Sequence, residues 1–221
     1  MAAFKAHFLT GLGVGYAASV ASAVGPWELD PVTPILVFAG TSAGALLPDL
    51  DSDNSTPFSV AFSLLAIAGG VVAFLYCLQQ SLLPWYAWSL IPPTVVLVLR
   101  FGVGWIFQKC TVHRGIFHSI PMAAIVTLAV CLALSSLNLL RTDVIALSLS
   151  VGLGFLSHLV LDELYSAVNF DGKKLGPKKS FGTALTLKSP SALATTCAYA
   201  LLCVLSYFNL ELFDVIKRRF L

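Results

Sequence analysis

Charged side chains are scarce in this chain. Asp, Glu, Lys and Arg together make up 11% of the residues, whereas they make up about 25% of a typical soluble domain. Apolar residues account for 57% and the mean hydropathy is +0.87. The five cysteines are scattered and form no CxxC pair, which argues against a cysteine-based metal or redox site. The composition excludes a soluble globular protein and predicts an all-α integral membrane protein, a polytopic bundle of transmembrane helices.

Several catalytic signatures are also missing. No HExxH or GxSxG motif occurs, so zinc proteases of that type and serine hydrolases are unsupported. The acidic segment fails as an EF-hand loop, because Asn54 and Val60 stand where glycine and glutamate are needed. Lipid phosphatases of the acid-phosphatase type place an arginine at the position of Gly152. No basic stripe with interleaved aromatic residues is present, so we expect no nucleic-acid partner.

Long apolar runs dominate the rest of the sequence. A membrane core of about 30 Å needs roughly 20 residues of helix, and about seven runs approach this length, with six to eight as the expected range. They cover residues 8–25, 32–48, 58–79, 85–107, 117–138, 143–164 and 190–210. The second is short, and the fourth contains Pro92, Pro93 and Arg100, so we expect it to be kinked or broken. Residues 1–221 are predicted to form one integral membrane domain.

The distribution of lysine and arginine predicts the orientation. The N-terminus lacks a signal-peptide pattern, so we expect residues 8–25 to be retained as the first span. With the N-terminus inside, the lysine-rich loop 166–189 is cytoplasmic, as the positive-inside rule requires. Its lysines would also attract anionic lipid headgroups. The basic residues after position 216 conflict with this arrangement, so the path of the C-terminal segment stays open.

Polar clusters at the ends of the spans are the strongest functional signal, because ionisable side chains are costly in a membrane and are retained mainly where they have a role. One histidine opens the first span, and an acidic cluster, LPDLDSD, closes the second. HRGIFHS opens the fifth span, and SHLVLD lies toward the end of the sixth. The residues are His7, Asp49, Asp51, Asp53, His113, Arg114, His118, His158 and Asp162. Alternation of the spans places all of these clusters on one membrane face.

Residue spacing indicates how the clusters could bind an ion. His158 and Asp162 are four residues apart, so they share one face of a helix and suit a common metal; the alternative is a histidine hydrogen-bonded to a carboxylate at a helix end. His113 and His118 are five apart, so we expect His113 in a loop and His118 near the first turn of the fifth span. Arg114 would bind phosphate or anchor the chain at lipid headgroups. The glycines of GLGVG, Gly11–Gly15, indicate close helix packing.

The N-terminal histidine, LPDLD, HRGIFHS and SHLVLD together resemble the YdjM-type membrane-bound metal-dependent hydrolases of bacteria and archaea. The resemblance covers residues 5 to about 185, with Phe117 where family members generally have threonine. A remoter similarity is to the zinc-dependent phospholipase C and P1 nuclease group, which binds zinc through histidines and HxxxD or HxxxE. The resemblance implies a hydrolase in the bacterial or archaeal cytoplasmic (inner) membrane. We expect its site to face the cytoplasm.

The expected activity is cleavage of a lipid phosphoester by metal-activated water. One or two Zn²⁺ ions, or Mn²⁺, would be bound by His7, Asp49, Asp51, His118, His158 and Asp162. Asp51 would take the proton, Arg114 would offset phosphoryl charge, and His113 would act in catalysis or as a further ligand. The expected partner is a membrane lipid, with an anionic phospholipid headgroup as substrate. A divalent-metal transporter and a scaffold with a structural metal are the alternatives. The oligomeric state is left open.

Overall fold

The structure is a computed structural model of the whole chain. It describes residues 4–51, 56–79, 84–105, 116–135, 137, 139–167, 182 and 185–210. The elements in order are α1 (Phe4–Val24), α2 (Thr33–Gly44), η1 (Pro48–Asp51), α3 (Thr56–Gln79), α4 (Trp85–Leu97), η2 (Val98–Val103), α6 (Ile120–Ser135), α7 (Arg141–Ala167) and α8 (Ala192–Phe208). The described residues contain no strand beyond one isolated bridge between Ser119 and Thr186. The prediction of an all-α fold is confirmed.

Each of the predicted apolar runs contains a helix, but the helices differ in length. In the described part of the chain, four are long and apolar enough to cross a membrane: Phe4–Val24, Phe58–Leu78 within α3, Tyr86–Val103 across α4 and η2, and Arg141–Ala167. The helices α6 and α8 are apolar but shorter. Helix α2 has 12 residues, about 18 Å of helix, against a hydrocarbon core of about 30 Å. The chain is a helical membrane protein, and the number of times that it crosses the membrane stays a prediction.

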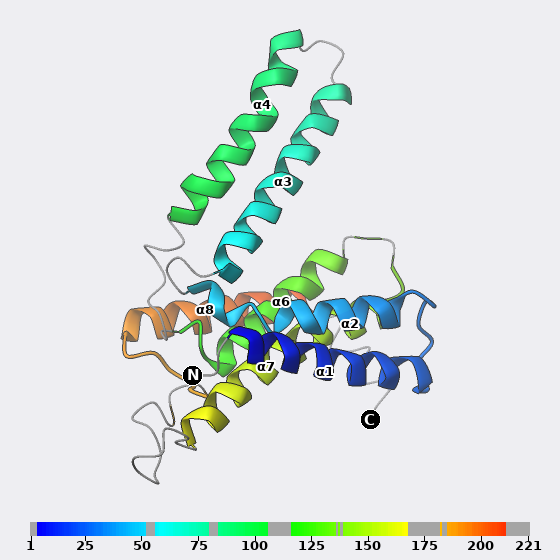
Figure 1. The fold of residues 1–221 in the computed structure, drawn as a ribbon, viewed down its shortest axis with the longest axis vertical. Helices are drawn as coiled ribbons and strands as arrows, with labels where there is room; N and C mark the ends of the chain where they lie inside the picture. Colours follow the sequence, from blue (N-terminus) through cyan, green and yellow to red (C-terminus); the bar gives the residue numbers. More distant parts are fainter. Residues whose placement is uncertain are drawn as a thin grey trace. The chain divides into compact units, whose positions relative to one another are not determined.

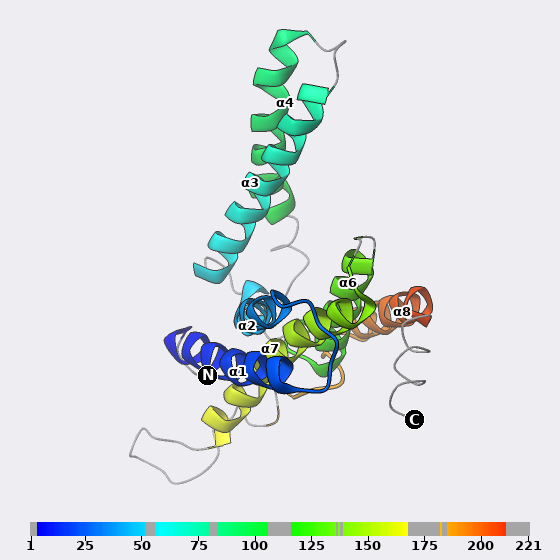
Figure 2. The ribbon, with the colours of Figure 1, turned by 90° about the vertical axis from the view of Figure 1, so that its right-hand side faces the viewer.

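The chain divides into two compact units, Met1–Pro48 with Arg114–Leu221, and Asp49–His113. In the first unit, α7 packs against α1, α2 and α6, and α8 packs against α6. Figures 1 and 2 show α7 (yellow-green) between the α1 and α2 pair and the α6 and α8 pair. The central position of α7 makes it the element that gathers residues from the other helices of this unit.

A buried stripe along α7 has a period of four residues, the spacing that keeps side chains on one helix face. Its members are Ser150, Gly154, His158, Asp162 and Ser166. Small residues in the stripe let α2 approach closely. A methyl group at Gly154 would overlap the carbonyl oxygen of Thr41 and lie 2.8 Å from the backbone nitrogen of Ala45. The close crossing of α2 and α7 therefore depends on this glycine.

The N-terminal end of α7 is held by a buried carboxylate. Asp143 is 2% exposed. Its Oδ1 accepts hydrogen bonds from the backbone N–H of Asp30 at 3.0 Å and from Thr33 Oγ1 at 2.8 Å. Thr142 donates from its hydroxyl to the carbonyl oxygen of Glu28 at 2.7 Å. These bonds tie the connection between α1 and α2 to the start of α7, which satisfies polar groups that would be costly in an apolar surrounding.

The second unit is a helical hairpin in which α3 packs along α4 and η2 (Figure 1). The sequence predicted a kink or a break at Pro92 and Pro93, and helix α4 continues through both prolines, so it is not broken there. The chain then widens into the π-helical segment η2. Prolines are tolerated inside such helices because neighbouring helices and local changes of helical pitch accommodate the freed backbone groups. The π segment contains Arg100, the one charged residue of α3, α4 and η2.

Candidate metal centre

Two helices of the first unit bring His7, His158 and Asp162 together. His7 shares a buried face of α1 with Gly11 and Gly15. At these glycines α2 lies so close that an added Cβ would be 2.6 Å from Ala45 Cβ and 2.9 Å from the carbonyl oxygen of Phe38, respectively. The close packing expected from GLGVG is therefore present at Gly11 and Gly15. It places the start of α1 against α7, where His158 and Asp162 are buried.

The three side chains form a compact cluster. His7 Nε2 lies 3.2 Å from Asp162 Oδ1, and His158 Nε2 lies 4.0 Å from Asp162 Oδ2. The two imidazole rings stack with centroids 3.6 Å apart and planes within 10°. The exposed fractions of His7, His158 and Asp162 are 1%, 1% and 4%. The cluster is therefore closed off from solvent on all three side chains.

A backbone hydrogen bond defines the tautomer of His158. Its Nδ1 lies 2.8 Å from the carbonyl oxygen of Ala45. A carbonyl oxygen can only accept, so Nδ1 carries the proton, and in the neutral ring the lone pair is on Nε2. That lone pair faces the Asp162 carboxylate. Two electron-rich groups facing each other inside a protein are stabilised by a cation between them, and metal-binding histidines usually donate their other N–H in this way.

The imidazole of His7 gives a second indication. Both of its ring nitrogens are buried and, among the described residues, neither has a hydrogen-bond partner. Nε2 is close to Asp162 but lacks hydrogen-bond geometry. A buried polar nitrogen without a partner costs about 1–3 kcal/mol. A bound metal ion would give Nε2 a partner.

His118 lies beside this cluster, with its ring centroid 5.6 Å from that of His158. It is 1% exposed and lies two residues before α6, near the first turn of this helix as expected. Thr186 fixes this turn. Its backbone carbonyl accepts from the N–H of Ile120 at 3.0 Å, and its hydroxyl donates to the carbonyl of His118 at 3.3 Å. The segment before α8 thus holds His118 next to His158.

The remaining predicted site residues are not tested by this geometry. Asp49 is the first residue of the second unit and is half-buried. The side chain of Asp51, at the end of η1, lies outside the described residues, as do Asp53, His113 and Arg114. Most of the predicted basic loop 166–189 also lies outside them. The roles assigned to these residues stay predictions.

The donor set fits a divalent ion. One ligand atom each from His7, His158 and Asp162 can be chosen so that all three lie within 4.8 Å of one another. Tetrahedral zinc ligands at about 2.1 Å from the metal are about 3.4 Å apart, so small side-chain rotations would close the site. Two imidazoles and one carboxylate leave one coordination position open, as in catalytic zinc sites. Imidazole also suits other transition metals, so the donor set does not identify the ion.

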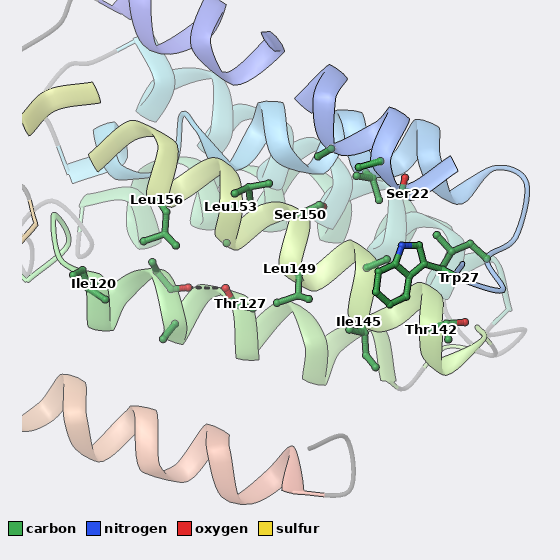
Figure 3. A pocket seen from close by; sticks show the side chains of 18 residues that line it. Ser22, Trp27, Ile120, Thr127, Thr142, Ile145, Leu149, Ser150, Leu153 and Leu156 are labelled. Atoms are coloured by element: carbon green, nitrogen blue, oxygen red, sulfur yellow. Dashed lines mark hydrogen bonds between the residues drawn. The ribbon is translucent and has the colours of Figure 1, made fainter. Parts of the chain in front are cut away.

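The same unit contains an apolar groove. It has a volume of about 680 Å³, within the range of ligand pockets. Its lining comes from α1, α2, α6, α7 and the connection between α1 and α2. Figure 3 shows Leu149, Leu153 and Leu156 of α7 along the groove, and Ile120 at the end nearest the start of α6. Ile120 and Leu156 are each two residues from a histidine of the site, His118 and His158.

The hydroxyl groups that line the groove are turned to the backbone. Thr127 donates to the carbonyl of Ala123 at 2.8 Å, the bond drawn in Figure 3. The hydroxyls of the three remaining lining residues with O–H groups, Ser22, Thr142 and Ser150, donate to backbone carbonyls at 2.7 to 2.8 Å. The groove therefore offers apolar surface to an occupant and no hydroxyl proton.

The fold and this site define a class: an α-helical membrane protein with a buried histidine and aspartate cluster suited to a metal. The sequence matches the model of the family described as YdjM inner membrane protein over residues 1–211, and the chain belongs to that family. The resemblance noted from the motifs is confirmed. No curated protein and no solved structure matches the chain.

The sequence motifs did not indicate two parts of the site. Ala45 contributes only a backbone carbonyl, which no sequence pattern identifies. Thr186 acts through a single isolated bridge, too short for the alternating pattern of a strand. The buried period-four stripe of α7 is the one signal that could have been found, because Gly154 precedes His158 by the same four residues that separate His158 from Asp162.

Proposed function

We propose that this protein is a membrane-embedded metal-dependent hydrolase that cleaves the phosphoester of a lipid. The observation that carries the proposal is the buried cluster of His7, His158 and Asp162, in which a histidine lone pair faces a carboxylate. Such a cluster is costly inside apolar helices without an ion. The family's description as an inner membrane protein supports the location, and the enzymatic step is our inference.

The roles of the chain's own residues follow from their contacts. The Ala45 carbonyl orients His158, and Asp162 lies between the two imidazoles as the negatively charged ligand. When bound, a divalent ion would supply a water of lowered pKa and polarise a phosphoryl oxygen. Of the residues predicted from the sequence, Asp51 would accept a proton, Arg114 would hold phosphoryl oxygens, and His113 would assist at the same site.

The groove supports a lipid as the substrate. Its wall is apolar, its hydroxyls are bound to the backbone, and its lining includes Ile120 and Leu156, each two residues along the chain from His118 or His158. The lining of α7 from Thr142 to Leu156 extends over about 21 Å, long enough for an acyl chain that crosses one leaflet of about 15 Å. In this proposal the chain of the lipid lies in the groove and its headgroup reaches the metal.

The burial of the ligands favours a second candidate, a structural ion that joins α1 to α7. His7, His158 and Asp162 are each no more than 4% exposed. A structural ion would stabilise the bundle without hydrolysis. The hydrolase and the structural ion therefore predict the same metal content and different activity.

Hydrolysis can be tested with the full chain purified in detergent. Mixed micelles of detergent and phosphatidylglycerol are incubated with the zinc-loaded or manganese-loaded protein, and water-soluble phosphorus is measured. We expect turnover that is lost after chelation and in Asp162→Asn. The matched control is Asp143→Asn, a buried aspartate on the same helix about 28 Å from Asp162. Stoichiometric metal with no turnover on phosphatidylglycerol, phosphatidic acid or phosphatidylethanolamine would refute the hydrolase and support the structural ion.

A further inference from the structure

A second polar cluster lies in the α3 and α4 hairpin, in the unit that does not contain His7, His158 and Asp162. The guanidinium of Arg100, in η2, donates from Nε to Ser63 Oγ at 3.1 Å and from Nη2 to Ser59 Oγ at 3.2 Å. Its central carbon lies 6.0 Å from the ring centroid of Phe58 and 5.5 Å from that of Phe101. The arginine is thus held on the α3 face of the hairpin between polar and aromatic partners.

The cluster has hydrogen-bond donors in excess. A guanidinium presents five N–H groups, and the two serine oxygens accept two of these. Each serine also keeps its own hydroxyl proton, for which no acceptor is found among the described residues. The segments α3, α4 and η2 contain no Asp or Glu. Unused N–H donors on a positive charge within these apolar helices favour an anionic acceptor at the site.

The position of the cluster indicates where that acceptor lies. The apolar window of α3 runs from Phe58 to Leu78. Ser59 and Ser63 are therefore about 1.5 and 7.5 Å inside its first end. The long arginine side chain can place its charge at the boundary while its methylenes stay in the apolar layer. Lipid phosphates are located at this boundary.

The backbone supports a dedicated site. Arg100 is in a π-helical segment, Val98–Val103. Such segments are rare insertions in α-helices and are frequently found at functional sites. Guanidinium binds phosphate oxygens through paired N–H groups, a geometry that lysine does not offer. We propose that Arg100, Ser59 and Ser63 form a binding site for the phosphate of an anionic phospholipid, separate from the metal centre and independent of hydrolysis.

The test uses the full chain purified in a zwitterionic detergent. Short-chain phosphatidylglycerol is titrated, and bound lipid is counted by native mass spectrometry, with short-chain phosphatidylcholine and inorganic phosphate as parallel probes. We expect Arg100→Gln to weaken phosphatidylglycerol binding about tenfold or more, the effect of losing one charged hydrogen bond. Arg100→Lys and the double variant Ser59→Ala, Ser63→Ala should each weaken it by a few-fold.

Arg141→Gln is the matched control, because Arg141 is an exposed arginine at the start of α7. This variant should bind lipid as the parent does. Size-exclusion elution and helical circular dichroism check that each variant is folded. If Arg100→Gln does not fold, the comparison is made with Arg100→Lys and with the double variant Ser59→Ala, Ser63→Ala. Unchanged affinity in the folded variants, or equal affinity for phosphatidylcholine, would overturn the proposal. Competition by inorganic phosphate at the concentration of the lipid would overturn the assignment to a lipid.

Discussion

A single methyl group at Gly154 should disturb the metal centre without touching any ligand. Gly154 lies at the crossing of α7 with α2, one helical turn before His158. The Cβ of alanine would overlap the Thr41 carbonyl oxygen and lie 2.8 Å from Ala45 N, about 0.6 Å inside ordinary contact at 3.4 Å. The helices must therefore separate, because the clashing atoms are backbone atoms that cannot rotate away.

The separation of the helices should lower both the stability of the protein and its affinity for metal, and the structure allows both effects to be estimated. Overpacking of a well-packed interior lowers the free energy of unfolding by about 1–3 kcal/mol. Replacing a glycine within a helix by alanine raises it by up to about 1 kcal/mol. The same movement lengthens the bond between His158 Nδ1 and Ala45 O, which is 2.8 Å in the native structure. Loss of such an orienting bond typically lowers metal affinity about 10- to 100-fold.

Gly13→Ala is the matched control, because an added Cβ there meets nothing within 4 Å. We expect Gly13→Ala to keep or raise the thermal stability and to retain metal. Gly154→Ala should lower the thermal stability and weaken zinc binding, measured by denaturation in detergent and by competition with a zinc indicator. Equal stability and equal zinc affinity of Gly154→Ala and the parent would refute the role assigned to the α2 and α7 crossing.

Three further predictions follow from the same structure. In Asp143→Ala the hydrogen-bond donors of Asp30 and Thr33 lose their acceptor. We expect the free energy of unfolding, measured with denaturant, to fall by about 1–3 kcal/mol per donor, with metal content unchanged. A loss of metal would contradict the independence of the metal centre from the N-terminal end of α7. His158→Ala should lower zinc affinity about tenfold or more, because it removes one of the three ligands; unchanged zinc affinity of the folded variant would argue against histidine ligands. Leu153→Trp should fill part of the groove and raise KM for long-chain lipids several-fold while short-chain lipids are unaffected; equal KM values for long-chain lipids would remove the groove from the substrate path.

Much of the fold could be predicted because apolar runs and the scarcity of charge determine where helices form in a membrane protein. The proximity of His158 and Asp162 followed from their spacing of four residues, and the packing of α1 followed from its glycines. Both depend on local helical geometry, which sequence periodicity reports directly.

Other features depend on contacts between distant segments. The stacking of His7 on His158 and the carbonyl of Ala45 at His158 Nδ1 arise from the crossing of α1, α2 and α7, which no local pattern specifies. The prolines at 92 and 93 suggested a kinked or broken span; the chain stays helical through them, so it is not broken there, and it widens at η2. Local helix-breaking tendency was outweighed by packing against α3.

The metal content of the purified protein tests the central claim most directly. Metal per chain is measured by elemental mass spectrometry after zinc or manganese loading and desalting, for the parent, His7→Phe, Asp162→Asn and the control Asp143→Asn. We predict stoichiometric metal in the parent and in Asp143→Asn, and its loss in His7→Phe and Asp162→Asn. A folded parent without metal, or undiminished metal in both ligand variants, would contradict a metal centre formed by His7, His158 and Asp162.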